Sequence, residues 1–194
     1  MEPPELQALL QESRALLQGH FVLSSGKHSD RYIQCALLLQ HPARAGLVGA
    51  AIGGVWRDEA VDVVMGPALG GIVVAHEVAR FLGTRAIFAE RDGGQMKLRR
   101  GFSVEHGERV LLVEDVVTTG GSVLEIARLV PGEAEVVGAS AIVDRRRDRE
   151  SAGRLPWPFR ALVQIDAIAW EPDECPLCRR GLPTEKPGSR QRPT

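Results

Sequence analysis

Strand-like apolar runs alternate with helical patterns from residue 61 onward, and this alternation restricts the fold more than any other feature of the chain. Parallel strands need a crossover connection that packs back on a face of the sheet, and this connection is usually a helix. We therefore expect an α/β fold in which a mostly parallel twisted sheet is flanked by helices. The expected strands are Val61–Met65, Arg85–Ala89, Val110–Val113, Val136–Val143 and Ala161–Ile165, and the expected helices between them are Ile72–Phe81 and Val123–Leu129.

Two further helices and a hairpin are expected ahead of this sheet. Leucines on one stripe predict a helix over Pro4–Gln18, and a second helix is expected over Pro42–Glu59. Between the two helices, the turn residues Ser24–Lys27 stand between apolar flanks, which favours a hairpin.

The domain organisation is expected to be simple, because 194 residues suit one domain with one core. We place this domain at 1–170, with about 1–40 forming a small N-terminal hood. A C-terminal tail follows over 171–194, and its composition predicts that it is loose from Gly181 onward.

Charge and cysteine usage narrow the class of protein. The chain has 24 basic and 25 acidic residues, whereas a nucleic-acid-binding domain is usually clearly basic. Its apolar stretches are shorter than the roughly 18 residues of a membrane helix, and its acidic, proline-rich start differs from a secretory signal. Three cysteines are an odd number without framework spacing. We expect a cytoplasmic protein that binds neither nucleic acid nor membranes.

Cys175 and Cys178 have the spacing of half a zinc knuckle, but a structural zinc site normally needs four ligands. The sequence holds no second cysteine pair, so we expect a metal role at most together with a partner chain. The histidines are scattered and show neither triad nor metal-ligand spacing; they are His20, His28, His41, His76 and His106.

The segment Val110–Ser122 carries the strongest functional signal. An apolar strand runs into two carboxylates, Glu114 and Asp115, and then into a Thr-Thr-Gly-Gly-Ser turn that opens a helix. Glycines let backbone N–H groups converge on an anion, and hydroxyl groups add donors. Because like charges repel, the carboxylates suit sugar hydroxyls or a hydrated Mg²⁺ beside a bound phosphate. The alternative is a solvated strand end followed by a capped helix.

This segment resembles the signature of the type I phosphoribosyltransferase family, namely an apolar strand, two acids, a short spacer and a turn rich in Thr and Gly. The resemblance implies the type I phosphoribosyltransferase fold. It places the acids at the ribose hydroxyls of phosphoribosyl pyrophosphate (PRPP) and the turn at its 5′-phosphate, with Mg²⁺ as a cofactor carried by PRPP near the acids and no direct metal ligand. The PRPP-binding residues expected here are Glu114, Asp115, Val116, Val117, Thr118, Thr119, Gly120, Gly121 and Ser122.

The segment Phe21–Ile33 is similar to the N-terminal hood of orotate phosphoribosyltransferases. The resemblance places Tyr32 and Ile33 against the flat pyrimidine. Many members carry a PRPP-contacting lysine where this chain has Ser24, which leaves Lys27 as the candidate for that role. A surface hairpin with one exposed lysine is the alternative.

The small-residue loop Met65–Gly71 follows one expected strand and precedes a helix. The resemblance assigns it to the pyrophosphate of PRPP, through Ala68, Leu69 and Gly70. A tight strand-to-helix turn with no ligand is the alternative.

An acid and three arginines end another strand, at Asp144–Arg147. A planar guanidinium can pair in two places with a carboxylate or an imide edge, both of which orotate offers. The resemblance assigns orotate binding to Arg145, with Arg146 as the second candidate, and we expect Thr118 to contact orotate as well.

The segment Glu90–Gly101 has the composition of a lid, since it is rich in glycine and charge. The resemblance implies a homodimer in which this loop reaches the neighbouring subunit's site. The chain lacks the Lys-Asp-His-Gly-Glu-Gly stretch that one branch of the family carries here. The candidate catalytic residues are Lys97 and Arg91, the possible substitutes are Arg99 and Arg100, and an exposed hairpin tip is the alternative.

The implied reaction transfers the phosphoribosyl group from PRPP to orotate, giving orotidine 5′-monophosphate and pyrophosphate in de novo pyrimidine biosynthesis. Negative charge grows on the departing pyrophosphate, where Mg²⁺ and Lys97 or Arg91 would stabilise it. Closure of the lid would exclude water from the activated sugar. The alternatives are a purine or uracil phosphoribosyltransferase and a non-catalytic regulator that binds PRPP.

Overall fold

A six-stranded sheet forms the centre of the computed structural model, which describes residues 3–23, 25–146 and 155–187. The strand order is β5-β4-β3-β6-β7-β8, and every neighbouring pair is parallel except β4 with β5. The mostly parallel α/β fold expected from the sequence is thus confirmed. The strands are β3 (Val63–Pro67), β4 (Arg85–Asp92), β5 (Gln95–Leu98), β6 (Arg109–Val117), β7 (Glu135–Asp144) and β8 (Phe159–Gln164).

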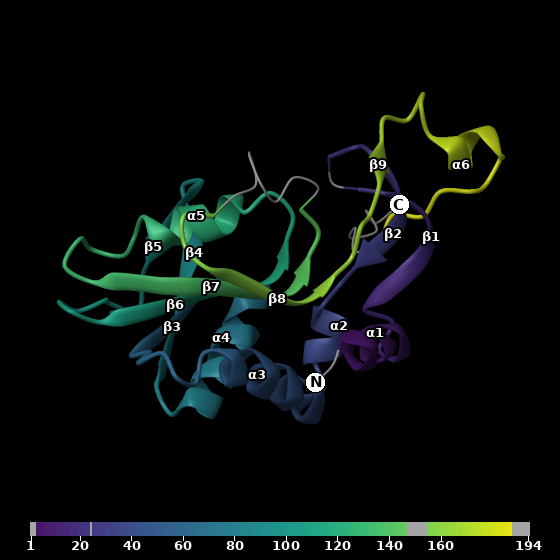
Figure 1. Cartoon of the computed structure of the whole chain (residues 1–194). Coiled ribbons are helices and arrows are strands. Elements are labelled where there is room, and N and C mark those ends of the chain that lie inside the picture. Colours follow the sequence, from purple (N-terminus) through teal and green to yellow (C-terminus); the bar gives the residue numbers. More distant parts are fainter. Residues whose placement is uncertain (1–2, 24, 147–154, 188–194) are drawn as a thin grey trace.

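Helices cover both faces of this sheet (Figure 1). Helices α3 (Pro42–Val55) and α4 (Gly70–Leu82) lie on one face, and α5 (Gly121–Ala127) lies on the other. The central strand β3 is buried at all five positions, as expected for a strand covered on both sides. The core therefore divides into one cluster of buried side chains on each face of the sheet.

Small residues and one tryptophan set the spacing between the helices and the sheet. A side chain on Gly49 of α3 would come within 2.6 Å of the Glu77 backbone in α4, so glycine allows the two helices to approach closely. Trp56, the residue directly after α3, is buried and donates a hydrogen bond from its indole N–H to the Ser140 hydroxyl at 2.7 Å. Its ring covers Gly138, where a Cβ would collide with it.

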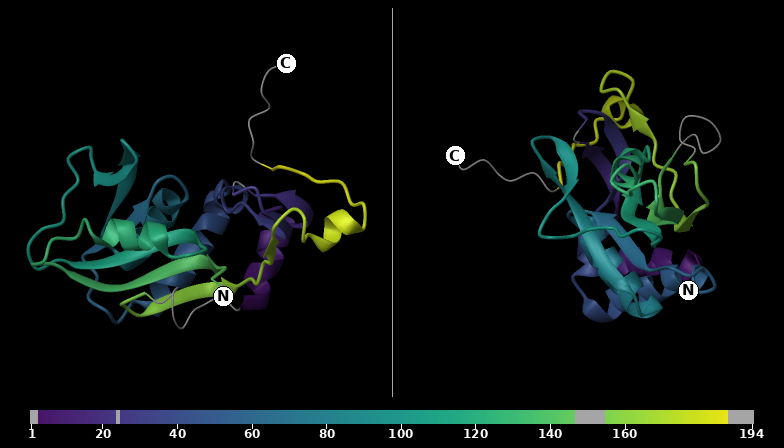
Figure 2. Two further views of the ribbon diagram at one scale, coloured as in Figure 1. Left: turned by 90° about the horizontal axis from the view of Figure 1, so that it is seen from above. Right: turned by 90° about the vertical axis from the view of Figure 1, so that its left-hand side faces the viewer.

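A second, three-stranded antiparallel sheet lies at one end of the molecule (Figures 1 and 2). We call it the hood sheet; it contains β1 (Leu16–Val22), β2 (His28–Ile33) and β9 (Ala169–Trp170). The predicted hairpin is confirmed, since β1 pairs with β2. The remaining helices are α1 (Pro3–Glu12), α2 (Ala36–Leu39) and the single turn α6 (Pro176–Arg179), which lies beside the hood sheet.

The predicted helix over Pro4–Gln18 is wrong in its second half. Helix α1 ends at Glu12, Arg14 adopts a positive φ of 56°, and the chain continues as strand β1. Leu16, which fitted the helical stripe, instead pairs with Ile33 across the hairpin. Tertiary pairing with β2 thus overrides the local leucine pattern.

The other elements differ from the expected boundaries mainly at their ends. The second expected helix ends at Val55 instead of Glu59, and the lid segment contains the hairpin of β4 and β5, with positive φ at Gly93 and Gly94. Among the described residues, no helix is long and apolar enough to cross a membrane.

The tail that the sequence predicts to be loose from Gly181 onward is paired with β1 at Glu185. The Val22 amide donates to the Glu185 carbonyl at 2.8 Å, and the Glu185 amide donates to the His20 carbonyl at 2.7 Å. This part of the tail is therefore hydrogen-bonded along β1. Residues 188–194 lie outside the described residues, and the domain boundary at residue 170 stays a prediction.

Candidate functional site

The loops that follow β3, β6 and β7 meet at one edge of the central sheet, because these three neighbouring strands run parallel. Val117, the last residue of β6, stands opposite Asp144, the last residue of β7. The loop after β3 touches the acid pair of β6, since a Cβ on Gly70 would collide with the Asp115 carboxylate. Ligand sites of parallel sheets form at this kind of edge.

A pocket with about 210 Å³ of empty space opens at the end of β6. Gly120 adopts a positive φ of 82°, which lets the chain turn sharply from the strand into α5. The pocket walls combine one carboxyl group with hydroxyl and backbone groups, a composition that suits a sugar phosphate. The lining residues are Glu114, Val116, Val117, Thr118, Thr119, Gly120, Ser122 and Val123.

Neighbouring backbone amides donate hydrogen bonds to both side chains of the acid pair. Glu114 Oε1 accepts a hydrogen bond from the Asp115 amide at 3.0 Å, and Asp115 Oδ1 accepts one from the Val116 amide at 2.8 Å. Glu114 is only 8% exposed, and burial together with the neighbouring Asp115 charge raises its pKa to about 9. At neutral pH the Glu114 carboxyl is therefore protonated and can donate a hydrogen bond to a ligand oxygen.

A buried thiol lies behind the acid pair. The Cys35 sulfur lies 4.0 Å from the Asp115 carbonyl oxygen. Burial, and then the charges of Asp115 and Glu114, raise the pKa of this thiol. Cys35 is therefore a packing residue and not an activated nucleophile.

The two candidate arginines after β7 have different surroundings. The Arg146 guanidinium is buried, donates to Asp144 at 3.0 and 3.1 Å, and stacks 4.2 Å from the Phe159 ring centre. In contrast, Arg145 Nε is buried without a hydrogen-bond partner among the described residues. Burial lowers the pKa of Arg145, and the nearby Asp30 charge partly offsets this effect. Arg145 is thus the arginine whose hydrogen-bonding capacity remains for a ligand.

Residues of the hood take up positions that the sequence only partly indicated. The Tyr32 ring packs at 5.8 Å from the Phe21 ring, and Ile33 packs against the core. Lys27, in the turn of the hairpin, forms an ion pair with Glu171 at 2.7 Å. Asp30 of β2, whose charge raises the pKa of Arg145, was not among the residues predicted from the sequence. Ser24, the departure from the family pattern, lies outside the described residues.

The lid segment forms ion pairs along the β4–β5 hairpin. Arg91 pairs with Glu125 of α5 at 2.7 Å and also donates to the Gly94 carbonyl at 2.9 Å, so the hairpin is tied to the helix that follows the phosphate turn. Lys97 pairs with Asp92 at 3.0 Å on the exposed side of the hairpin. Glu125 was also missed by the sequence analysis.

The expectation that the cysteine pair lacks further ligands within this chain is wrong. His20 and His28 bring their ring nitrogens to Cys175 and Cys178, and all four ligand atoms lie within 4.8 Å of one another. This arrangement was not predicted because the segment up to Gln18 was expected to be a helix, whereas it forms part of strand β1. With β1 paired to β2, both histidines belong to one hairpin, and this is the signal that could have found them.

Comparison with known proteins gives consistent matches. A family model described as "Phosphoribosyl transferase domain" matches residues 36–172. The chain is 49% identical over 185 residues to the orotate phosphoribosyltransferase of Caldicellulosiruptor bescii, covering 95% of this chain and 96% of that protein. It is 47% identical over 192 residues to the orotate phosphoribosyltransferase of Pelotomaculum thermopropionicum, covering 98% and 100%. The crystal structure of the orotate phosphoribosyltransferase from Aeropyrum pernix superposes with a TM-score of 0.69 at 27% identity, over 82% of this chain and 93% of that chain.

Proposed function

Because the chain belongs to the phosphoribosyltransferase family and, within it, to the orotate phosphoribosyltransferases, we propose that it transfers the phosphoribosyl group of PRPP to orotate. The products are orotidine 5′-monophosphate and pyrophosphate, and the reaction belongs to pyrimidine biosynthesis. One observation of the structure carries this proposal furthest: the Glu114 carboxyl and a hydroxyl-rich turn line one pocket, and the next strand ends at Arg145, whose Nε has no hydrogen-bond partner among the described residues.

In this proposal the pocket at the end of β6 binds the ribose 5′-phosphate. The turn from Thr118 to Ser122 surrounds the phosphate, while Glu114 and Asp115 bind the ribose hydroxyls. A protonated Glu114 donates to a hydroxyl oxygen, which supports this arrangement. The loop Ala68–Gly70 touches Asp115 and is therefore well placed for the pyrophosphate end of PRPP.

The base is proposed to bind between the hood and the end of β7. Arg145 has an unused donor there, and a guanidinium fits the carboxylate or the imide edge of orotate. Thr118 contributes from the phosphate turn, and Tyr32 and Ile33 from β2. The Arg146 guanidinium forms an ion pair with Asp144, which argues against Arg146 as the residue that contacts the base.

The chemistry then depends on positioning and charge. The bond from ribose C1 to pyrophosphate breaks, the bond from C1 to N1 of orotate forms, and negative charge accumulates on the leaving group. Lys97 and Arg91 are proposed to stabilise that charge once the lid segment releases their present partners, Asp92 and Glu125. Lys27 would leave Glu171 in the same way to contact PRPP.

We further propose Mg²⁺ as the cofactor, bound to PRPP. Mg²⁺ prefers oxygen ligands and keeps several waters, which fits a hydrated ion next to Glu114 and Asp115 better than a cage of protein ligands. When bound, the ion supplies charge neutralisation to the pyrophosphate.

A homodimer with a lid shared between subunits, in the cytoplasm, completes the proposal. Four apolar side chains on α3 and α4 are at least 38% exposed and could lie in such an interface; they are Leu47, Val55, Val73 and Phe81. The three cysteines are free thiols, which fits a reducing compartment.

A base panel tests the proposed function. The protein is mixed with PRPP, Mg²⁺ and one of orotate, uracil, adenine or hypoxanthine, and nucleotide formation is followed. Turnover is expected with orotate and not with the other bases. Turnover of a purine or uracil without orotate would contradict the substrate assignment, and binding of PRPP without any turnover would favour a regulator.

A further inference from the structure

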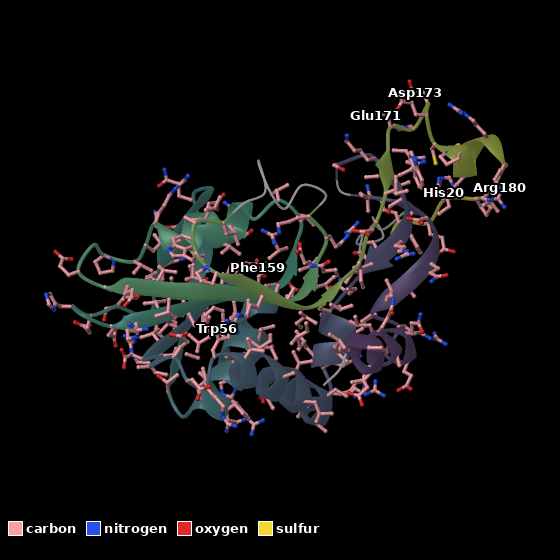
Figure 3. The ribbon with its side chains drawn as sticks, in the orientation of Figure 1. His20, Trp56, Phe159, Glu171, Asp173 and Arg180 are labelled. Carbon is pink, nitrogen blue, oxygen red and sulfur yellow. The ribbon has the colours of Figure 1, made fainter. Side chains whose placement is uncertain are left out.

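The cluster of His20, His28, Cys175 and Cys178 lies in the hood, and the proposed transfer reaction does not use it. His20 comes from β1, His28 from β2, and the two cysteines from the turn around α6 (Figure 3 labels His20 beside that segment). Three of the four are buried, with exposed fractions of 4% for His20, 9% for His28 and 0% for Cys175. Polar side chains with this degree of burial need partners.

The ligand atoms converge on a common point. His20 Nε2 lies 2.9 Å from His28 Nδ1, 3.4 Å from the Cys175 sulfur and 3.7 Å from the Cys178 sulfur, and His28 Nδ1 lies 3.2 Å from the Cys178 sulfur. Bond lengths of about 2.0–2.1 Å to nitrogen and about 2.3 Å to sulfur, at tetrahedral angles, separate such atoms by roughly 3.3–3.8 Å. The four separations given above, 2.9 to 3.7 Å, lie close to this range, and all four ligand atoms are within 4.8 Å of one another, so small movements of the side chains would bring them to the corners of a zinc tetrahedron.

A hydrogen bond outside the cluster fixes the orientation of one ring. His20 Nδ1 lies 2.9 Å from the Leu182 carbonyl oxygen, which can only accept, so Nδ1 carries the proton and Nε2 presents its lone pair to the cluster. Metal-binding histidines commonly donate their other N–H to a backbone carbonyl in this manner. The Leu182 amide in turn donates to the Leu177 carbonyl at 3.1 Å. The residue that orients the His20 ring is therefore hydrogen-bonded to the turn that contains the two cysteines.

We propose that His20, His28, Cys175 and Cys178 bind one structural Zn²⁺. Two thiolates and two neutral imidazoles are a ligand set that zinc prefers, and four protein ligands close the site to substrate. Binding releases one proton from each cysteine thiol, and no electron is transferred. The ion joins the hairpin β1–β2 to the C-terminal segment, and this role is independent of the proposed transfer reaction.

The metal content of the unmodified protein is the first test. The protein is expressed in medium with zinc, desalted and measured by elemental analysis, and we expect one zinc per chain. Replacement by Co²⁺ should give the absorption of tetrahedral cobalt with thiolate ligands. Zinc-free protein that does not take up Zn²⁺ from a buffered solution would overturn the proposal, as would tightly held iron or a Cys175–Cys178 disulfide detected by mass.

Variants then assign the ligands. Cys178→Ser and His28→Ala should each lower the zinc content and speed the loss of zinc to a chelator, whereas His76→Ala, at an exposed histidine of α4, should retain the full content. Chelator should also lower the unfolding temperature of the unmodified protein and increase cleavage of the segment after residue 165 by protease. Equal zinc content in Cys178→Ser, His28→Ala and His76→Ala would overturn the assignment even if one variant folds poorly.

Discussion

At the scale of single residues, the site contains a carboxyl group in an environment that opposes its ionisation. Glu114 is buried beside Asp115, and its pKa is raised to about 9. In the unfolded chain a glutamate has a pKa near 4.3. Because the folded state holds the proton more tightly, the free energy of unfolding falls as the pH rises from about 4.3 to about 9. The residue thus lowers the free energy of unfolding at neutral pH.

Glu114→Gln should therefore become more stable than the unmodified protein as the pH rises. Between pH 6 and pH 8 the difference in unfolding free energy should grow by up to about 1.4 kcal/mol per pH unit. Urea denaturation at the two pH values measures it. A difference that stays constant with pH would contradict the raised pKa of Glu114.

Substitutions of the two arginines after β7 should affect different properties, orotate binding in one case and stability in the other. Arg145→Ala should raise the KM for orotate about ten- to hundredfold, the loss expected from about 1.5–3 kcal/mol of hydrogen bonding to a charged group. Arg146→Ala leaves the buried Asp144 carboxylate without its ion pair and should lower the unfolding free energy by about 3–5 kcal/mol. Steady-state kinetics and thermal unfolding of both variants check this, and the reverse pattern would exchange the two roles.

At the scale of secondary-structure elements, the central sheet and the hairpin of the hood were predictable, whereas the extent of strand β1 and the pairing of β9 were not. The strands β3, β6 and β7 each contain a run of mostly apolar residues that is buried, so their sequence pattern and their burial agree. Strand β1 carries leucines at helical spacing, and only its pairing with β2 makes it extended. Such long-range pairing leaves no local signal. The proposed metal ligands were missed for the same reason, since they lie up to 158 residues apart.

In the candidate site, too, the part formed by contiguous residues was predictable, and the part that depends on contacts in the folded chain was not. The acid pair and the phosphate turn are contiguous in the sequence, and the structure places most of these residues in one pocket. The choice between Arg145 and Arg146 depends on which guanidinium finds a partner in the folded chain, and three arginines in a row cannot show that. The roles of the individual residues remain predictions.

The β4–β5 hairpin is the element whose movement the proposed chemistry requires. Lys97→Ala should lower kcat about a hundredfold while changing the KM for PRPP little, because its charge is needed mainly as pyrophosphate leaves. Arg100→Ala is the matched control, since Arg100 lies just beyond the same hairpin and pairs with Glu90. Steady-state kinetics at saturating orotate measures both, and a larger loss in Arg100→Ala would identify Arg100 as the catalytic cation.

At the scale of the whole molecule, a shared lid makes a prediction about mixed subunits. Lys97→Ala and Asp115→Asn are each expected to be nearly inactive. If the lid acts on the neighbouring subunit's site, half of the randomly mixed dimers carry one intact site, so a mixture should recover about a quarter of the unmodified activity. Activity measured after unfolding and refolding the mixture tests this. A mixture as inactive as its components would place the lid over its own subunit's site.

The hood sheet joins the two ends of the described chain, because strands β1 and β2 near its start pair with β9 and with Glu185 near its end. The ribosome makes the chain from the N-terminus at about 5–20 residues per second, so β2 waits on the order of ten seconds before β9 exists. During that interval strands β3 to β7 of the central sheet are synthesised, but the edge of β2 that pairs with β9 has no partner strand. Completion of the hood is therefore a late event in synthesis, and a chain released before β8 lacks both the last strand of the central sheet and the third strand of the hood.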